Sequence, residues 1–156
     1  MDIRYQDVSN DIIELASQLV QLHFSHFEKQ NITIKYLFDV KKKLHNGKLV
    51  LGTCYKSNDL VRHLTIEEAS NEFGYDYVII LDKIVYQNAS PDDRIRIIRH
   101  ELRHVDKDEY TEKCYINPHN IEDFIEEIEL NMDKPRWASE LTSTALEIYE
   151  EIDNKN

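Results

Sequence analysis

Residues 90–105 of the chain read SPDDRIRIIRHELRHV, and this stretch predicts the helix around which the fold is organised. Ser90 is a typical N-cap, Pro91 suits the first helical position, and Asp92 and Asp93 place acids in the first turn. The periodicity extends the predicted helix over about residues 91–108. An apolar stripe, which should pack on a sheet, begins about one turn after the cap. It consists of Ile95, Ile98, Leu102 and Val105. A basic stripe follows the far side, made of Arg96, Arg99, Arg103 and Lys107.

The same helix carries HELRH, residues 100–104, on a face between the two stripes. Two imidazoles at positions i and i+4 can both reach one zinc ion at about 2.0–2.1 Å. Glu101 then lies beside the zinc-bound water without being a ligand, so it can act as the general base while zinc acidifies the water. The plain alternative is a charged surface helix that carries two half-exposed histidines.

A catalytic zinc site needs a third protein ligand, and the segment after the helix offers several. His119 lies fifteen residues after His104, whereas Glu122 or Glu126 would give a site of two histidines and one glutamate. Cys114 is a weaker fallback. Around the ligands, Asp108 is placed to orient an imidazole, and Tyr110 or Tyr115 could donate a hydrogen bond to an oxyanion.

The remaining patterns predict helices around a small sheet in one domain over residues 1–156. Helical periodicity covers about 7–29, with strands and loops following over 32–83. Within that region an Asn-Gly turn at 45–48 predicts a hairpin whose returning strand is 48–55. A buried strand is expected at 75–83, and two C-terminal helices over about 120–132 and 135–152. The expected class is therefore α+β, with a mostly antiparallel sheet of about three strands packed on the HExxH helix.

Charge and composition narrow the classes of function. Of the net charge of −11, the C-terminal residues 101–156 contribute about −10, a surface that disfavours nucleic-acid binding. The longest apolar run, 77–81, is too short to span a membrane, and residues 1–10 do not read as a secretory signal. Cys54 and Cys114 are too few for a disulfide framework. We therefore expect a cytoplasmic protein that contacts neither nucleic acid nor membrane.

The strand 75–83, the HELRH helix and the segment INPHNIEDF, residues 116–124, together resemble the putative phage metallopeptidase family of small SprT-like zincins. The resemblance covers about residues 32–126. It implies a minimal zincin fold, one zinc ion per chain held by His100, His104 and His119, and Glu101 as the base. Arg103 departs from the family pattern, which is often apolar there. The terminal helices carry no motif of the family.

The function predicted from these observations is zinc-dependent hydrolysis of peptide bonds in an intracellular protein. One alternative is a zinc-binding interaction module without turnover. Another is an anti-repressor or anti-defence protein that acts through the acidic C-terminal face. The sequence leaves the substrate, the cleavage preference and the oligomeric state open.

Overall fold

A computed structural model describes residues 3–119 and 124–155 of the chain. Its main sheet has four strands in the order β1-β2-β6-β5. These are β1 (Tyr5–Asp7), β2 (Ile34–Asp39), β6 (Tyr77–Asp82) and β5 (Gly52–Lys56). The central pair β2–β6 is parallel, while β1–β2 and β5–β6 are antiparallel. The α+β class is therefore confirmed, although the sheet has one more strand than predicted and is mixed.

The hairpin predicted at the Asn-Gly turn is present but is smaller than expected. The turn joins β3 (Leu44–His45) to β4 (Lys48–Leu49), which pair only with each other. The chain then enters β5, which pairs with β6 and not with the strand before the turn. β6 takes the centre of the sheet because Tyr77, Ile79 and Leu81 are fully buried on one of its faces.

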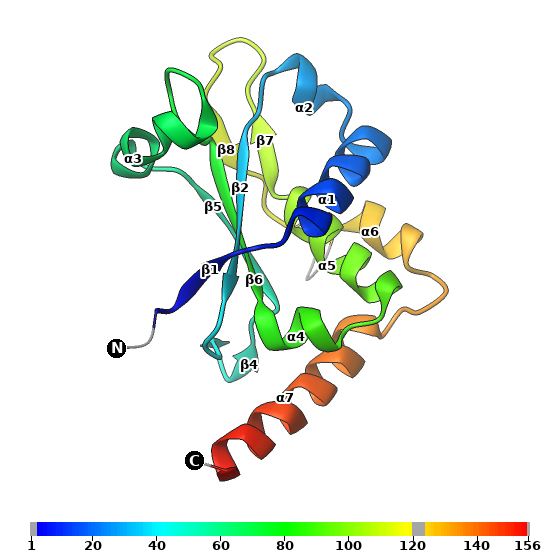
Figure 1. Cartoon of the computed structure of the whole chain (residues 1–156). Helices are drawn as coiled ribbons and strands as arrows, with labels where there is room; N and C mark the ends of the chain where they lie inside the picture. The colour runs from blue at the N-terminus through cyan, green and yellow to red at the C-terminus, as the bar shows by residue number, and fades with distance from the viewer. Residues whose placement is uncertain (1–2, 120–123, 156) are drawn as a thin grey trace.

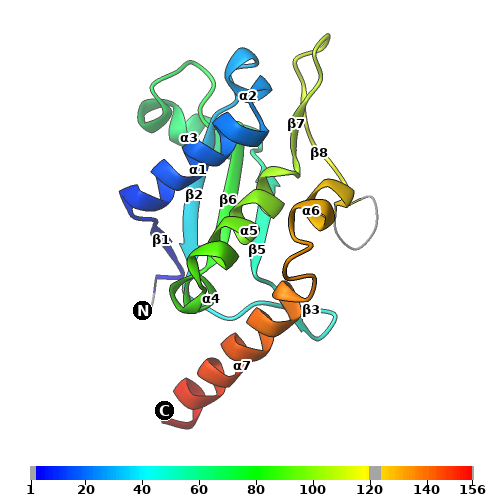
Figure 2. The same cartoon turned by 90° about the vertical axis from the view of Figure 1, so that its right-hand side faces the viewer.

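Helices α1 (Asn10–His23) and α5 (Pro91–Leu102) lie together on one face of this sheet (Figures 1 and 2). Their buried apolar side chains join those of the sheet in one core. The single helix predicted over 7–29 is in fact two, because the chain leaves helical geometry at Phe24 before α2 (His26–Lys29). The rings of Phe24 and Phe27 stack at 5.2 Å and are both buried, which accounts for the break.

Two helices flank β6 and β5. α3 (Asp59–Ala69) occupies most of the region predicted as a loop with a short helix, and Asn58 caps it through the amide of Val61. α4 (Lys83–Asn88), which the sequence did not predict, starts directly after β6, where the Asp82 carboxylate accepts the amide hydrogen of Val85. In the part of the chain that the structure describes, no helix is long and apolar enough to cross a membrane.

The start of the HExxH helix is as predicted, but its end is not. Ser90 accepts a hydrogen bond from the amide of Asp93, and Pro91 opens α5. The helix ends at Leu102 and not at Asp108, because the chain continues into a hairpin of β7 (Val105–Lys107) and β8 (Cys114–Ile116). The buried apolar positions of α5 are Ile97, Ile98 and Leu102, whereas Ile95 is only half-buried.

The C-terminal part contains α6 (Ile125–Leu130) and α7 (Trp137–Lys155). The first four residues of the helix predicted over 120–132 lie outside the described residues. Of the apolar residues in this region, Phe124 is buried, whereas Ile125 and Ile128 are exposed. α7 runs past α4 along the lower edge of the molecule, and Trp137 and Leu141 anchor it to the core (Figure 1).

Candidate metal centre

The structure brings three of the predicted site residues together: His100, His104 and His119. His100 lies in the last turn of α5, His104 follows the end of that helix, and His119 comes from the segment after β8. One ring nitrogen from each lies within 4.8 Å of the other two. The Nε2 atoms of His100 and His119 are 3.1 Å apart. Three side chains from two segments therefore converge on one point.

This donor set fits a zinc ion. Two nitrogens bound at about 2.0–2.1 Å to a tetrahedral zinc lie about 3.3 Å from each other, close to the separation of the two Nε2 atoms. Three neutral imidazoles also leave a fourth position, as catalytic zinc sites require. Among the described residues, no other group of histidine, cysteine, aspartate or glutamate side chains has this geometry.

The orientation of His104 is set by the segment after β8. Its Nδ1 lies 2.8 Å from the carbonyl oxygen of Asn117, so Nδ1–H donates there and Nε2 is left for a metal. Asn117 also donates its amide hydrogen to the carbonyl of His104 and its side-chain amide to the carbonyl of Arg103. Sequence reasoning missed this role of Asn117, because a backbone carbonyl leaves no signature in the residue type.

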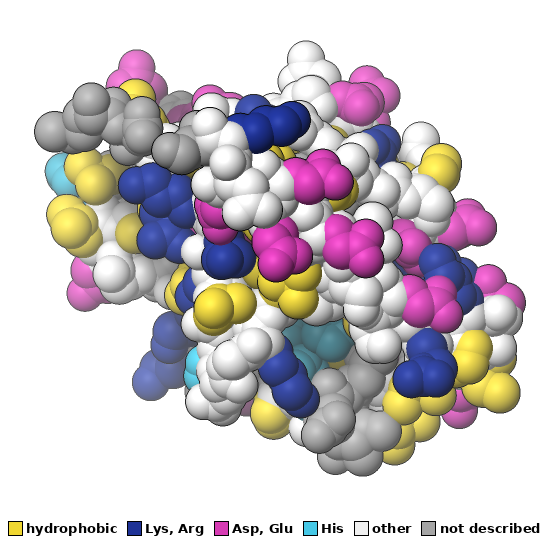
Figure 3. All heavy atoms as spheres, turned by 90° about the horizontal axis from the view of Figure 1, so that it is seen from below, with side chains coloured by type: hydrophobic (Ala, Val, Ile, Leu, Met, Phe, Trp, Pro, Cys, Tyr) yellow, Lys and Arg dark blue, Asp and Glu magenta, His cyan; other side chains and the backbone are white. Residues whose placement is uncertain are grey.

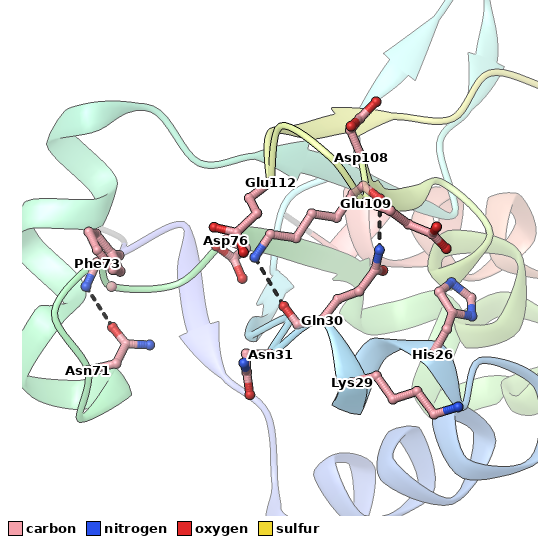
Figure 4. Close-up of a pocket in the computed structure, with 12 residues that line it drawn as sticks. His26, Lys29, Gln30, Asn31, Asn71, Phe73, Asp76, Asp108, Glu109 and Glu112 are labelled. Atoms are coloured by element: carbon pink, nitrogen blue, oxygen red, sulfur yellow. Dashed lines mark hydrogen bonds between the residues drawn. The ribbon is translucent and has the colours of Figure 1, made fainter.

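The other candidates for supporting roles lie elsewhere. Asp108 caps the β7–β8 turn by accepting the amide hydrogens of Tyr110 and Thr111, and Tyr110 is almost fully exposed. The hydroxyl of Tyr115 donates to Asp106 at 2.7 Å. Asp108 also lines a separate hollow of about 530 Å³. Beside this hollow, the side chains of Gln30 and Lys107 each donate a hydrogen bond to the backbone carbonyl of the other residue (Figure 4). The structure therefore gives Asp108 a turn-forming role and does not bring it to the histidines.

Of the alternative third ligands, the structure does not bring Glu126 or Cys114 into the cluster. Glu126 is exposed on α6 and is absent from the group whose donor atoms converge. Glu122 lies outside the described residues. Cys114 is in β8, where its sulfur accepts a hydrogen bond from Arg62 at 3.7 Å. Cys54 and Cys114 are both free thiols.

Glu101 is buried next to the histidines and below the edge of β5. Only 6% of its surface is exposed. A Cβ atom added to Gly52 would approach the Cγ and Oε1 atoms of Glu101 to 3.2 Å, so the glycine leaves room for the carboxyl group. Burial raises the pKa of Glu101 to about 7, against the opposing effect of His100. Such a carboxyl group can take up and release a proton near neutral pH.

The three imidazoles share one apolar neighbour, Phe124. The centroid of its ring lies 5.3, 5.0 and 4.9 Å from the ring centroids of His100, His104 and His119. Phe124 itself is 1% exposed and immediately precedes α6. The position of α6 therefore bears directly on the positions of the histidines.

The predicted basic stripe of α5 holds α6 in place and does not face solvent. Arg99 and Arg103 each donate to one carboxylate oxygen of Glu127, at 2.7 and 2.9 Å, and Glu127 is fully buried. Asn131 accepts from Arg99 at 2.6 Å and from Arg96 at 3.3 Å. Lys107, the last member of the predicted stripe, lies in β7 and contacts Gln30. We call Arg96, Arg99, Arg103, Glu127 and Asn131 the arginine clamp.

A cleft of about 980 Å³ opens over His100, Glu101 and His119. Seen from below, histidine side chains lie in a hollow of this face, with Lys or Arg side chains at its rim (Figure 3). One wall is the chain from the β3–β4 turn to Gly52, and the other is the first half of α7. The α7 wall consists of Trp137, Ala138, Ser139, Thr142, Ser143 and Leu146.

Comparison with known proteins identifies the family of the chain. A model of the family described as "Putative phage metallopeptidase" matches residues 4–146, which is nearly the whole chain. The match extends well beyond the region 32–126 that the motifs had indicated. No curated protein and no solved structure gives a significant match.

Proposed function

The chain belongs to the putative phage metallopeptidase family, and on that premise we propose that it is a zinc-dependent peptidase. The observation that carries the proposal is the convergence of His100, His104 and His119 beside the buried Glu101, at the floor of an open cleft. A metal-binding cluster that served only to stabilise the fold would not need a carboxyl group next to it or a cleft above it.

In this proposal the three imidazoles hold one zinc ion through ring nitrogens. When bound, zinc supplies a Lewis acid that polarises the scissile carbonyl and lowers the pKa of a water molecule. His104 is held ready by its hydrogen bond to the Asn117 carbonyl, which fixes both the tautomer and the ring orientation. Phe124 packs against all three rings and restricts their rotation.

Glu101 moves the proton. As water attacks the scissile carbonyl, the Glu101 carboxylate accepts one of its protons, and it returns this proton to the amide nitrogen as the C–N bond breaks. At the end of the reaction Glu101 is again an unprotonated carboxylate. Burial of Glu101 between α5 and Gly52 keeps bulk water from competing for its oxygens.

The substrate is a peptide or an unfolded segment of a protein. The cleft runs between a continuous stretch of chain, residues 45–52, and the first half of α7, an arrangement that suits an extended chain better than a compact small molecule. We further propose that the substrate is intracellular, in the cytoplasm of the host cell if a phage encodes the protein.

The test is hydrolysis of a mixture of denatured proteins by the zinc-loaded protein, beside Glu101→Gln. We expect cleavage by the wild type, none after chelation, and a loss of about 10²- to 10⁴-fold in the variant with its zinc retained. Equal zinc content without cleavage in either protein would contradict the proposal and leave a zinc-binding interaction module. Equal cleavage by both would show that Glu101 is not the base.

A further inference from the structure

The cleft differs in charge from the protein that surrounds it. The chain has a net charge of −11, yet among the described residues Glu101 is the only acidic residue that lines the cleft, and it is buried. The α7 wall presents small or apolar side chains to the cleft. On the opposite wall, His45 and Lys48 line the cleft directly. The described lining of the cleft is therefore poor in acidic side chains, although the chain as a whole is strongly acidic.

The positive side of the cleft is part of a longer basic segment. Residues 41–48, KKKLHNGK, contain four lysines and one histidine and no acid. We call residues 41–48 the basic arm. Its first three residues precede the β3–β4 hairpin, and the others belong to that hairpin. Lys41, Lys42, His45 and Lys48 are exposed, and Lys43 is half-buried. The basic arm stands beside the cleft and continues directly into the lining that ends at Gly52.

The lysines of the basic arm make few contacts with carboxylates within the fold, although the ammonium groups of Lys42 and Lys43 lie 5.9 and 5.4 Å from the ring centroids of Tyr149 and Tyr55. Lys43 donates to the hydroxyl of Tyr55 at 2.8 Å, which leaves its charge unneutralised. Lys42 lies 3.9 Å from Asp153, and both side chains are solvent-exposed. Within residues 3–119 and 124–155, neither Lys41 nor Lys48 forms an ion pair. By contrast, Lys35 and Lys134 each contact two carboxylates.

We propose that the basic arm binds an acidic segment of the substrate, next to the bond that is cut. The inference rests on the proposed function, since it assigns the cleft to a peptide. Exposed lysines interact weakly one at a time, but several beside one groove add their attractions and also speed encounter with an acidic chain. A neutral or basic segment gains nothing from the basic arm, so the preference should appear as selectivity for acidic substrates.

A single-stranded nucleic acid is the other class of polyanion that lysines attract. Such binding normally combines a basic groove with aromatic side chains on which bases stack. In the described part of the cleft lining, Trp137 is the one aromatic residue apart from the histidines, and it is buried. The strong negative charge of the rest of the chain also repels a long phosphate backbone. The observations therefore favour a short acidic peptide.

The experiment measures binding, so that it does not depend on turnover. Zinc-loaded Glu101→Gln is titrated into fluorescein-labelled peptides in which eight consecutive residues are Glu, Gln or Lys, and into a twelve-residue oligothymidine. Fluorescence anisotropy at low and high salt gives the Kd values. The variant Lys41→Gln/Lys43→Gln/Lys48→Gln is compared with Lys56→Gln/Lys113→Gln/Lys155→Gln, which removes three exposed lysines away from the cleft. Circular dichroism and zinc content check that both variants are folded.

We expect the glutamate peptide to bind about tenfold more tightly than the glutamine peptide at low salt, a preference that fades at high salt. The arm variant should lose this preference, and the control variant should keep it. Equal binding of the two peptides, an unchanged arm variant, or tighter binding of the oligothymidine would each overturn the proposal. Failure of the proposed peptidase would appear separately, as absent hydrolysis, and would leave these Kd values readable.

Discussion

Two faces of α5 carry ionisable side chains, and the protein uses them in opposite ways. On one face Arg96 and Arg99 are buried and paired with carboxylate or amide groups of the C-terminal region. On the other, His100 borders an open cleft and points at two more imidazoles. One ring nitrogen from each of the three imidazoles lies within 4.8 Å of the other two, a geometry that suits a bound metal ion. The arginine face therefore stabilises the fold, and we propose that the histidine face binds a ligand.

The largest expected effect is on the arginine face. Replacing Glu127 with Ala leaves Arg99 and Arg103 beside α6 without their carboxylate, and breaking a buried pair of this kind costs about 3–5 kcal/mol. The free energy of unfolding, measured by denaturant titration without metal, should fall by that amount. Glu129→Ala, an exposed position on the same helix, is the matched control and should change it by less than about 0.5 kcal/mol. A loss below about 1 kcal/mol in Glu127→Ala would show that the clamp does not hold α6.

The histidine face should make the free energy of unfolding depend on zinc. A ligand that binds only the folded state stabilises it by about 2.7 kcal/mol when its concentration is one hundred times its Kd. Adding zinc at that ratio should therefore raise the unfolding free energy of the wild type but not that of His100→Ala. Without metal the two proteins should differ little, since His100 lies at the edge of the cleft. If zinc stabilised the wild type and His100→Ala equally, His100 would not be a zinc ligand.

The smallest expected effect comes from Gly52, which lies against the general base proposed here. In Gly52→Ala the new methyl group meets the Glu101 side chain at 3.2 Å and shifts the carboxyl group by a few tenths of an ångström. We expect turnover to fall about tenfold, because small misplacements of catalytic groups are costly, while zinc content stays unchanged. Steady-state rates on any cleaved peptide provide the measurement. Unaltered turnover would mean that the position of Glu101 is not critical.

The start of α5 could be predicted from sequence because the signals there are local. Ser90, Pro91 and the following acids specify a helix start through neighbouring backbone groups, and the structure has it there. The pairing of HELRH histidines was also predictable from spacing along the chain. Spacing alone left His119, Glu122 and Glu126 as candidates, and it was the family resemblance that favoured His119; the return of the chain after β8 to His104 through Asn117 is a contact that spacing does not indicate.

What could not be predicted depends on contacts between distant segments. The end of α5 was placed six residues too late, because the periodicity of Val105 fits a strand that begins there as well as a helix. The arginines looked like a solvent-facing stripe, since nothing in their own segment indicates that Glu127 and Asn131 cover them. β5 was assigned to the wrong neighbour for the same reason: a turn signal identifies a hairpin but not which strand the chain pairs with afterwards.

The zinc content of the purified protein tests the three-histidine centre most directly. It is measured by elemental analysis after equilibration with excess zinc and dialysis. The wild type and Glu101→Gln are predicted to hold one zinc ion per chain, and His119→Ala is predicted to lose it while remaining folded. Glu126→Gln, the alternative ligand on α6, should keep its zinc. Zinc retained in His119→Ala, or no zinc in the wild type, would contradict the three-histidine centre on which the proposed peptidase depends.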